Sequence, residues 1–271
     1  MSKLAQLRRF WNWYRRAETV YQVHSPFVFD LANAVLEDRR RFYAFDDIEG
    51  LRWRLMRSKE TLKMTDYGAG SKVVGTTTRR LAQVARDSAN AGRRGRLLFR
   101  LVDFLNPRTL LELGTSLGIG TLYQRAGAGG ADIVTLEGCP QTADRARHHF
   151  NIMKRGEIEV RTGPFDQTLP AVLSEKEQFD YIFVDGDHRY EPTLRYFEQM
   201  LPFVGDRSAI VFDDIHWSDD MERAWNEIRT HDRVTLSVDF FFCGVVFFRQ
   251  EQREREHFDL APTGWKPWMM R

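Results

Sequence analysis

The chain has 271 residues, of which 42% are hydrophobic and 29% are charged, a balance typical of a globular protein with a large core. This composition excludes a wholly disordered or collagen-like chain. Lysine and arginine number 40 against 38 aspartates and glutamates, and the formal charge of +2 does not favour wholesale wrapping of nucleic acid. The longest apolar run, residues 240–248, is too short to span a bilayer, so no membrane partner is expected.

The cysteine content and the first residues predict the compartment. Cys139 and Cys243 by themselves can form neither a disulfide framework nor a zinc site. The N-terminal sequence lacks the apolar region and the cleavage site of a secretory signal. We therefore expect a cytoplasmic protein.

Residues 1–96 are predicted to be an N-terminal helical extension or lid. Apolar residues recur at helical spacing along 4–14 and 27–35, and the Ser25-Pro26 pair is typical of a helix start. The glycine-rich patch 66–71 is interpreted as a turn or lid loop. A phosphate-binding P-loop is not favoured there, because Thr76 stands where the loop requires its lysine.

Short apolar runs alternate with amphipathic stretches from residue 109 onward, at 110–113, 133–136, 158–160, 181–184 and 209–212. This alternation predicts a parallel sheet with helices on both faces. Two further runs, 234–238 and 245–248, follow each other without a helix, which predicts an antiparallel pair. The expected fold is α/β, a doubly wound, mostly parallel seven-stranded sheet with the last strand antiparallel, within a domain of residues 97–249. The tail 250–271 begins with a charge run, 250–257, interpreted as a solvated helix.

A glycine-rich turn lies between the first of these strands and the helix after it. Gly114, Gly118 and Gly120 allow the backbone to approach a ligand, and the helix N-terminus presents free N–H groups to an anion. Glu137, nineteen residues after Gly118, ends the next strand, where an acid can accept hydrogen bonds from both hydroxyls of a ribose. The combination predicts a nucleoside site. The alternative is a tight turn in an α/β domain that binds no nucleoside.

These residues, with the segments 162–165, 179–188 and 211–216, resemble the motifs of class I S-adenosylmethionine-dependent methyltransferases. The resemblance covers residues 97–249 and implies S-adenosylmethionine as the cofactor. The residues that it implies for cofactor binding are Glu112, Gly114, Thr115, Ser116, Gly118, Gly120, Glu137 and Asp185, with adenine near Gly163, Pro164 and Phe165. Pro164 departs from the family pattern, which has an acid in the adenine turn.

Three aspartates follow two strands that are neighbours in this family's sheet. Asp185 ends one of them, and Asp213 and Asp214 end the other, so the carboxylates are expected to lie close together. An all-oxygen set suits Mg²⁺, Mn²⁺ or Ca²⁺ rather than zinc, and Mg²⁺ is expected. The pattern is similar to metal-dependent small-molecule O-methyltransferases of the catechol, caffeoyl-CoA and macrolide-sugar types. The alternative is that Asp213 and Asp214 cap the next helix.

Methylation of a hydroxyl requires that its proton be removed, which a bound cation and a nearby base both promote. The resemblance offers two candidate bases. His216 stands where the macrolide-sugar type has a histidine base, and His188 stands where the catechol type has a catalytic lysine.

The predicted function is O-methylation of a small hydroxylated acceptor with divalent-metal assistance. Two alternatives stay open. One is methylation of nucleic acid or protein, which the arginine-rich N-terminal region motivates although nucleic acid is not the expected partner. The other is a nucleoside-binding module without turnover. Neither the acceptor nor the oligomeric state, including a homodimer, follows from the sequence.

Overall fold

The computed structural model describes residues 3–66, 75–87, 92–251 and 254–269, and it divides the chain into two compact units. The first unit comprises residues 1–39 and 178–271, and the second comprises residues 40–177. The ends of these units do not coincide with the predicted boundaries at residues 96 and 249. The glycine-rich patch 66–71 falls almost wholly outside the described residues.

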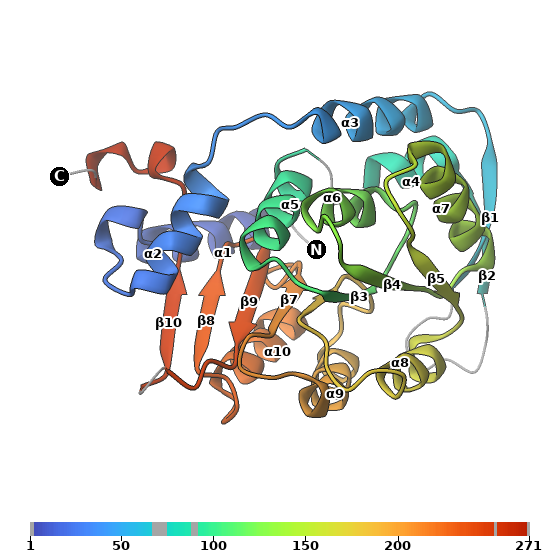
Figure 1. Ribbon diagram of the computed structural model, residues 1–271. Helices are drawn as coiled ribbons and strands as arrows, with labels where there is room; N and C mark the ends of the chain where they lie inside the picture. Colours follow the sequence, from blue (N-terminus) through green and yellow to red (C-terminus); the bar gives the residue numbers. More distant parts are fainter. Residues whose placement is uncertain (1–2, 67–74, 88–91, 252–253, 270–271) are drawn as a thin grey trace. The chain divides into compact units, whose positions relative to one another are not determined.

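The second unit alternates strands with helices (Figure 1). Its elements are α3 (Tyr43–Met56), β1 (Thr61–Asp66), β2 (Gly75–Arg80), α4 (Leu81–Asp87), α5 (Arg93–Leu105), β3 (Thr109–Leu113), α6 (Ile119–Gly127), β4 (Asp132–Glu137), α7 (Pro140–Met153), β5 (Glu159–Thr162) and α8 (Phe165–Leu173). Strands β3, β4 and β5 are neighbours in this order and run parallel. Strands β1 and β2 form a separate antiparallel pair.

Residues of the helices that flank these strands form much of the core of the second unit. Phe45 and Ile48 of α3, Phe99 of α5 and Tyr123 of α6 are buried together, with the rings of Phe45 and Phe99 in edge contact at 4.9 Å. The apolar residues of β3 and β4 are buried as well, which explains why both strands are continuous apolar runs in the sequence.

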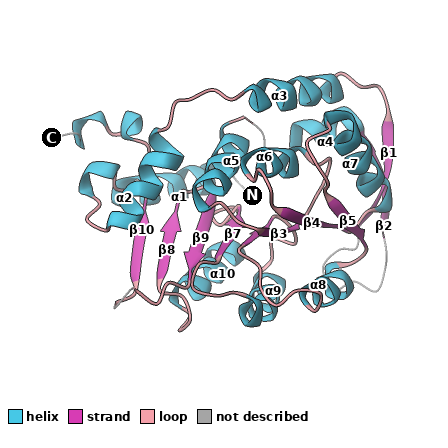
Figure 2. Ribbon diagram, viewed as in Figure 1, coloured by secondary structure: helices cyan, strands magenta, loops and turns pink. Residues whose placement is uncertain are grey.

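The first unit contains the N-terminal helices together with the strands and helices that follow residue 178. Its helices are α1 (Lys3–Arg16), η1 (Val20–Gln22), α2 (Pro26–Ala32), the π-helical η2 (Asn33–Glu37), α9 (Tyr190–Met200), η3 (Leu201–Phe203), α10 (Asp219–Thr230), η4 (Thr263–Trp265) and η5 (Pro267–Met269). Its strands are β6 (Tyr181–Val184), β7 (Ala209–Asp213), β8 (Leu236–Asp239), β9 (Cys243–Phe247) and β10 (Glu256–Asp259). The strand order is β10-β8-β9-β7-β6, and the first four are drawn side by side in Figure 2.

Strand directions in the first unit confirm the predicted mostly parallel α/β pattern with one reversed strand. Strands β6 and β7 are parallel, whereas β9 is antiparallel to both β7 and β8. Strand β10 is an addition to the seven predicted strands, and the helix predicted for residues 250–257 is wrong at its end. Residues 256–259 pair parallel with β8. Their side chains alternate between the two faces of the sheet, and His257 and Asp259 lie on the face that carries Ser237.

An aromatic cluster holds α1 against the C-terminal part of the first unit. Trp13 is 1% exposed, its indole N–H donates to the backbone oxygen of Asp239 at 3.3 Å, and its ring lies 6.2 Å from that of Trp265. The ring of Phe10 contacts Phe241 edge-on at 5.0 Å. These contacts place the polar face of α1 beside β8 and β10.

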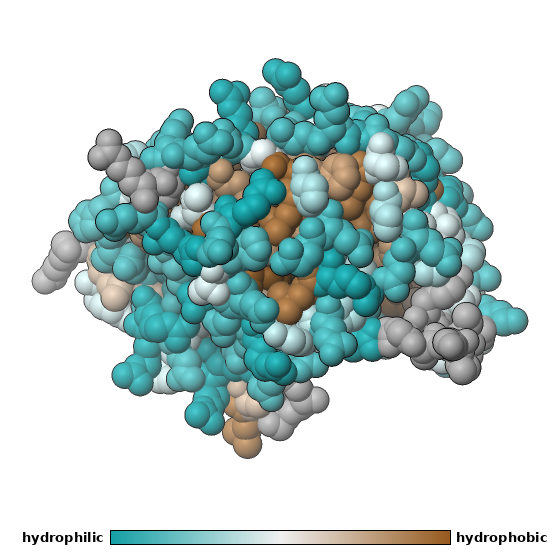
Figure 3. Space-filling view, turned by 90° about the horizontal axis from the view of Figure 1, so that it is seen from below, coloured by the Kyte–Doolittle hydropathy of each residue, from teal (hydrophilic) through white to brown (hydrophobic). Residues whose placement is uncertain are grey.

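The surface agrees with the high charged fraction of the sequence. The face drawn in Figure 3 is mainly hydrophilic. None of the helices described is both long enough and apolar enough to cross a membrane.

Candidate functional site

The turn between β3 and α6 takes a backbone shape that requires glycine. Gly114, Ser116 and Gly118 all have positive φ, at 104°, 49° and 79°. A Cβ on Gly118 would lie 2.5 Å from a ring carbon of Phe150, so both the backbone angle and the packing exclude a side chain there. Gly120 is buried in the first turn of α6. The glycines singled out in the sequence therefore make the abrupt strand-to-helix turn possible.

Glu112 on β3 connects this turn to α6 and β4 through hydrogen bonds. The residue is 1% exposed, and its carboxylate accepts hydrogen bonds from Thr121 at 2.5 Å, Gln124 at 2.6 Å and Thr135 at 2.6 Å. The Thr135 hydroxyl has one proton, which it donates to Glu112, so Thr115 is the donor in the 2.6 Å contact between the two threonines. The structure thus places the carboxylate of Glu112 in the interior, where it positions the turn.

Glu137 binds the same turn from the end of β4. Its Oε2 accepts from the backbone N–H of Ser116 at 2.7 Å, and its Oε1 accepts from that of Cys139 at 2.9 Å. The residue is only half-buried, and each carboxylate oxygen has a second lone pair. Glu137 is therefore held in one orientation at the strand end, beside the glycine turn.

The turn after β5 lies beside Glu137. The N–H of Gly163, which has a φ of 148°, donates to the backbone oxygen of Glu137 at 2.9 Å. Pro164 precedes α8, which begins at Phe165. The carboxyl ends of β3, β4 and β5 thus bring together the glycine turn, Glu137 and the 163–165 turn, at the edge where α/β sheets bind ligands. Among the residues predicted to bind the cofactor, Asp185 belongs to the first unit.

Three carboxylates lie at the strand ends of the first unit. Val184 pairs with Phe212, so Asp185 and Asp213 follow at adjacent positions of β6 and β7. Asp213 is 2% exposed, and Asp214 has a positive φ of 51°. The predicted juxtaposition of the aspartates is therefore present in the backbone.

His188 provides a positive charge beside these carboxylates. Its Nε2 lies 3.5 Å from Oδ1 of Asp185. Burial by itself lowers the pKa of His188, but the hydrogen bond and charge of Asp185, together with the charges of Asp214 and Asp213, raise the pKa to about 9. The imidazole is thus protonated near neutral pH, and in that state it donates rather than accepts a proton.

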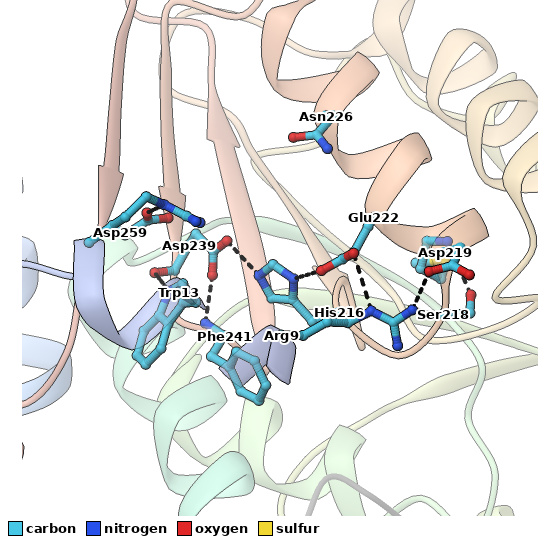
Figure 4. Close-up of polar contacts among 12 residues, drawn as sticks. Arg9, Trp13, His216, Ser218, Asp219, Glu222, Asn226, Asp239, Phe241 and Asp259 are labelled. Carbon is cyan, nitrogen blue, oxygen red and sulfur yellow. Dashed lines mark hydrogen bonds and ion pairs between the residues drawn. The ribbon is translucent and has the colours of Figure 1, made fainter. Parts of the chain in front are cut away.

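His216 lies between two carboxylates (Figure 4). Its Nδ1 is 2.8 Å from Glu222 and its Nε2 is 2.8 Å from Asp239, while its ring stacks on Phe241 at 5.1 Å. Burial lowers the pKa of His216, but the hydrogen bonds and charges of Asp239 and Glu222 raise it to about 9. Both ring nitrogens therefore carry protons that are donated to protein carboxylates, and removal of a substrate proton by His216 would require one of these bonds to break.

The residues that hold His216 have no signal of that role in the sequence. Glu222 also contacts Arg9 of α1 at 3.2 Å, and Arg9 forms a further ion pair with Asp219. Asp239 stands out only as a charged residue at the end of an apolar run, and nothing near Arg9 indicates that α1 reaches α10. The predicted capping of α10 by Asp213 or Asp214 is wrong, because the Ser218 hydroxyl accepts from the N–H of Met221 at 3.1 Å.

The predicted metal ligands do not form a metal site in the part of the chain that the structure describes. No group of three histidine, cysteine, aspartate or glutamate side chains there could hold an ion.

Comparisons with known proteins agree with the site in the second unit. Residues 111–215 match the family model described as a methyltransferase domain. Over 138 residues the chain is 31% identical to a catechol O-methyltransferase from Mycobacterium tuberculosis, a match that covers 49% of this chain and 60% of that protein. An uncharacterised protein of Acanthamoeba polyphaga mimivirus is 27% identical over 36% of this chain and 47% of its own. The chain therefore matches these curated relatives over about half of their length.

Solved structures share the fold at low identity. An SAH-bound methyltransferase from Podospora anserina has a TM-score of 0.59 at 17% identity, covering 84% of this chain and 98% of that chain. An O-methyltransferase from Bacillus cereus in complex with SAH has a TM-score of 0.52 at 23% identity, covering 82% and 97%. These matches agree with the resemblance seen in the sequence: residues 111–215 match a methyltransferase domain, and the fold is that of solved methyltransferases.

The raised pKa of His216 predicts how stability depends on pH. Because the pKa in the folded protein, about 9, exceeds the ordinary 6.5, the contribution is fully present below pH 6.5 and is lost as pH rises to about 9. The difference corresponds to on the order of 3 kcal/mol. His216→Gln should therefore lower the free energy of unfolding in urea below pH 6.5 and have a much smaller effect above pH 9. His148→Gln, at an exposed position of α7, is the control. An equal loss at both pH values would contradict the assigned charge.

Proposed function

We propose that this protein is an S-adenosylmethionine-dependent O-methyltransferase that acts on a small hydroxylated acceptor. The observation that carries the proposal is the set of contacts in the second unit. There the buried Glu112 fixes the glycine turn, and Glu137 is bound to that turn through the Ser116 N–H. The similarity of about half of the chain to a catechol O-methyltransferase supports a hydroxylated acceptor.

The residues at the ends of β3, β4 and β5 fit the parts of the cofactor. When bound, S-adenosylmethionine supplies a methyl group on a positively charged sulfur. Glu137, held at the end of β4 beside the glycine turn, accepts hydrogen bonds from the ribose hydroxyls. The first N–H groups of α6 interact with the amino-acid carboxylate, and the turn 163–165 contacts the adenine.

The acceptor chemistry is assigned to the strand ends of the first unit. A hydroxyl becomes a good nucleophile when its proton leaves, and this proposal gives that proton to the carboxylates at the ends of β6 and β7, Asp185, Asp213 and Asp214. The protonated His188 next to Asp185 lowers the pKa of a hydroxyl that it contacts, because a nearby positive charge favours the anion.

The prediction from sequence also includes assistance by a divalent metal ion. No three of the described histidine, cysteine, aspartate or glutamate side chains are arranged to hold a cation, and Asp185 is paired with His188. The proposal therefore routes no step through a metal, and His188 takes the role of the positive charge.

The cofactor assignment predicts the effect of a change at Glu137. Glu137→Gln replaces a charged acceptor by an amide, and we expect the affinity for S-adenosylhomocysteine to fall roughly ten- to hundredfold. Glu159→Gln is the matched control, because Glu159 is an exposed residue of β5 that pairs with Arg161. Isothermal titration calorimetry measures both variants. Equal affinity of the two would remove Glu137 from the cofactor site.

The acceptor assignment predicts the effects of a chelator and of a change at His188. With catechol as the trial acceptor, methyl transfer from labelled S-adenosylmethionine should continue in EDTA. His188→Gln should slow it by about a hundredfold or more, the contribution expected of a preorganised positive charge beside the reacting oxygen. His231→Gln, at the end of α10 beside Glu198, should leave the rate unchanged. Loss of transfer in EDTA with recovery in Mg²⁺ would instead support the predicted cation.

A further inference from the structure

A pocket lies wholly within the first unit, between α1 and α10 and beside strands β8 and β10. Its volume is about 800 Å³, which is within the range of small-molecule sites. Arg8, Arg9 and Arg16 of α1 line it on one side, and Trp225 and Arg229 of α10 line it on the other. Figure 4 shows the network at its base, with Arg9, Glu222, His216 and Asp239 in a row.

Each carboxylate that lines the pocket is paired with a cation of the protein. Glu222 and the exposed Asp219 pair with Arg9, and Glu222 and Asp239 share the protonated His216. Asp259 accepts from Arg16 at 2.9 Å and from His257 at 3.3 Å. The hydrogen bonds and charges of His257 and Arg16 keep the pKa of Asp259 low despite its burial. Three cations, Arg9, Arg16 and the protonated His216, thus balance all but one of the four negative charges.

Two arginines of the lining remain after this pairing. Within the described residues, neither Arg8 nor Arg229 forms an ion pair with a carboxylate. Arg229 donates from Nε to the side-chain oxygen of Asn226 at 2.9 Å, which leaves its terminal N–H groups available. Arg8 is exposed on the same helix as Arg9. The pocket thus has an excess of positive charge from guanidinium groups on two facing helices.

A buried donor in the pocket wall also requires an acceptor. Trp225 is 3% exposed, and its indole N–H has no hydrogen-bond partner in the described part of the chain. Its ring is held against β9, where a Cβ on Gly244 would approach it to 2.5 Å, so the indole cannot move toward the strand. A buried donor without an acceptor is costly, and a ligand oxygen would remove that cost.

We propose that this pocket binds a small anionic molecule that bears a carboxylate or a phosphate. Arg8 and Arg229 pair with its negative charge, since guanidinium groups bind both anions through parallel N–H bonds. The indole N–H of Trp225 donates to an oxygen of the same molecule. The site consists of residues outside the glycine turn and the aspartates, and the inference does not rest on the proposed methyl transfer.

The test is a titration of the full chain with inorganic phosphate and, separately, with malonate, at constant ionic strength. The assigned indole N–H signal of Trp225 is followed in ¹H–¹⁵N spectra. We expect this signal to shift saturably with at least one of the two anions, and the anion that binds more tightly identifies the phosphate or carboxylate class. Arg8→Gln and Arg229→Gln should each weaken binding by about tenfold.

Arg15→Gln is the matched control, because Arg15 is an exposed arginine of α1 that does not line the pocket. This variant should bind the anion as the unmodified protein does. The absence of a Trp225 shift with either anion would overturn the proposal. So would an equal loss of affinity in the Arg8, Arg229 and Arg15 variants, since that result would mean a general effect of surface charge.

Discussion

The carboxylate of Glu112 is 1% exposed and accepts hydrogen bonds from two side chains of α6 and one of β4. A buried charge is stable only when its oxygens are satisfied in this way, so the three elements cannot move apart without a large loss of free energy. The chain of donation from Thr115 through Thr135 to Glu112 extends the constraint into the glycine turn. The turn is therefore shaped before any ligand arrives, which lowers the entropy that binding costs.

In the first unit as well, buried charges are stabilised by their partners, which here are groups of the opposite charge. His216 and His188 are cations among carboxylates, and Arg9 completes the compensation around Glu222. Because both imidazoles are protonated, their chemistry is that of fixed positive charges. This arrangement assigns proton removal to the aspartates in the account given above. It also leaves Arg8 and Arg229 in the pocket between α1 and α10 without a carboxylate partner among the described residues.

The parts of the fold predicted from sequence are those whose causes are local. Buried parallel strands are continuous apolar runs, and the turn after β3 is marked by glycines where the backbone needs positive φ. Glu137 is found because a strand end can be located from its pattern. The interior role of Glu112 depends on partners such as Thr135, which no local pattern connects with it. Arg9 and Glu222 come from distant parts of the chain, and β10 lies in a charge run, so neither has a periodic signal in the sequence.

The central claim is that Glu112 holds the turn in the shape that binds a nucleoside. The most direct test is calorimetric titration of S-adenosylhomocysteine into the unmodified protein and into Glu112→Gln, with urea unfolding of both proteins to confirm that they are folded. The account predicts saturable binding to the unmodified protein and a loss of affinity of at least about tenfold in the variant, because an amide cannot accept all three hydrogen bonds. Binding of equal affinity in both proteins, or no binding to the folded unmodified protein, would contradict it.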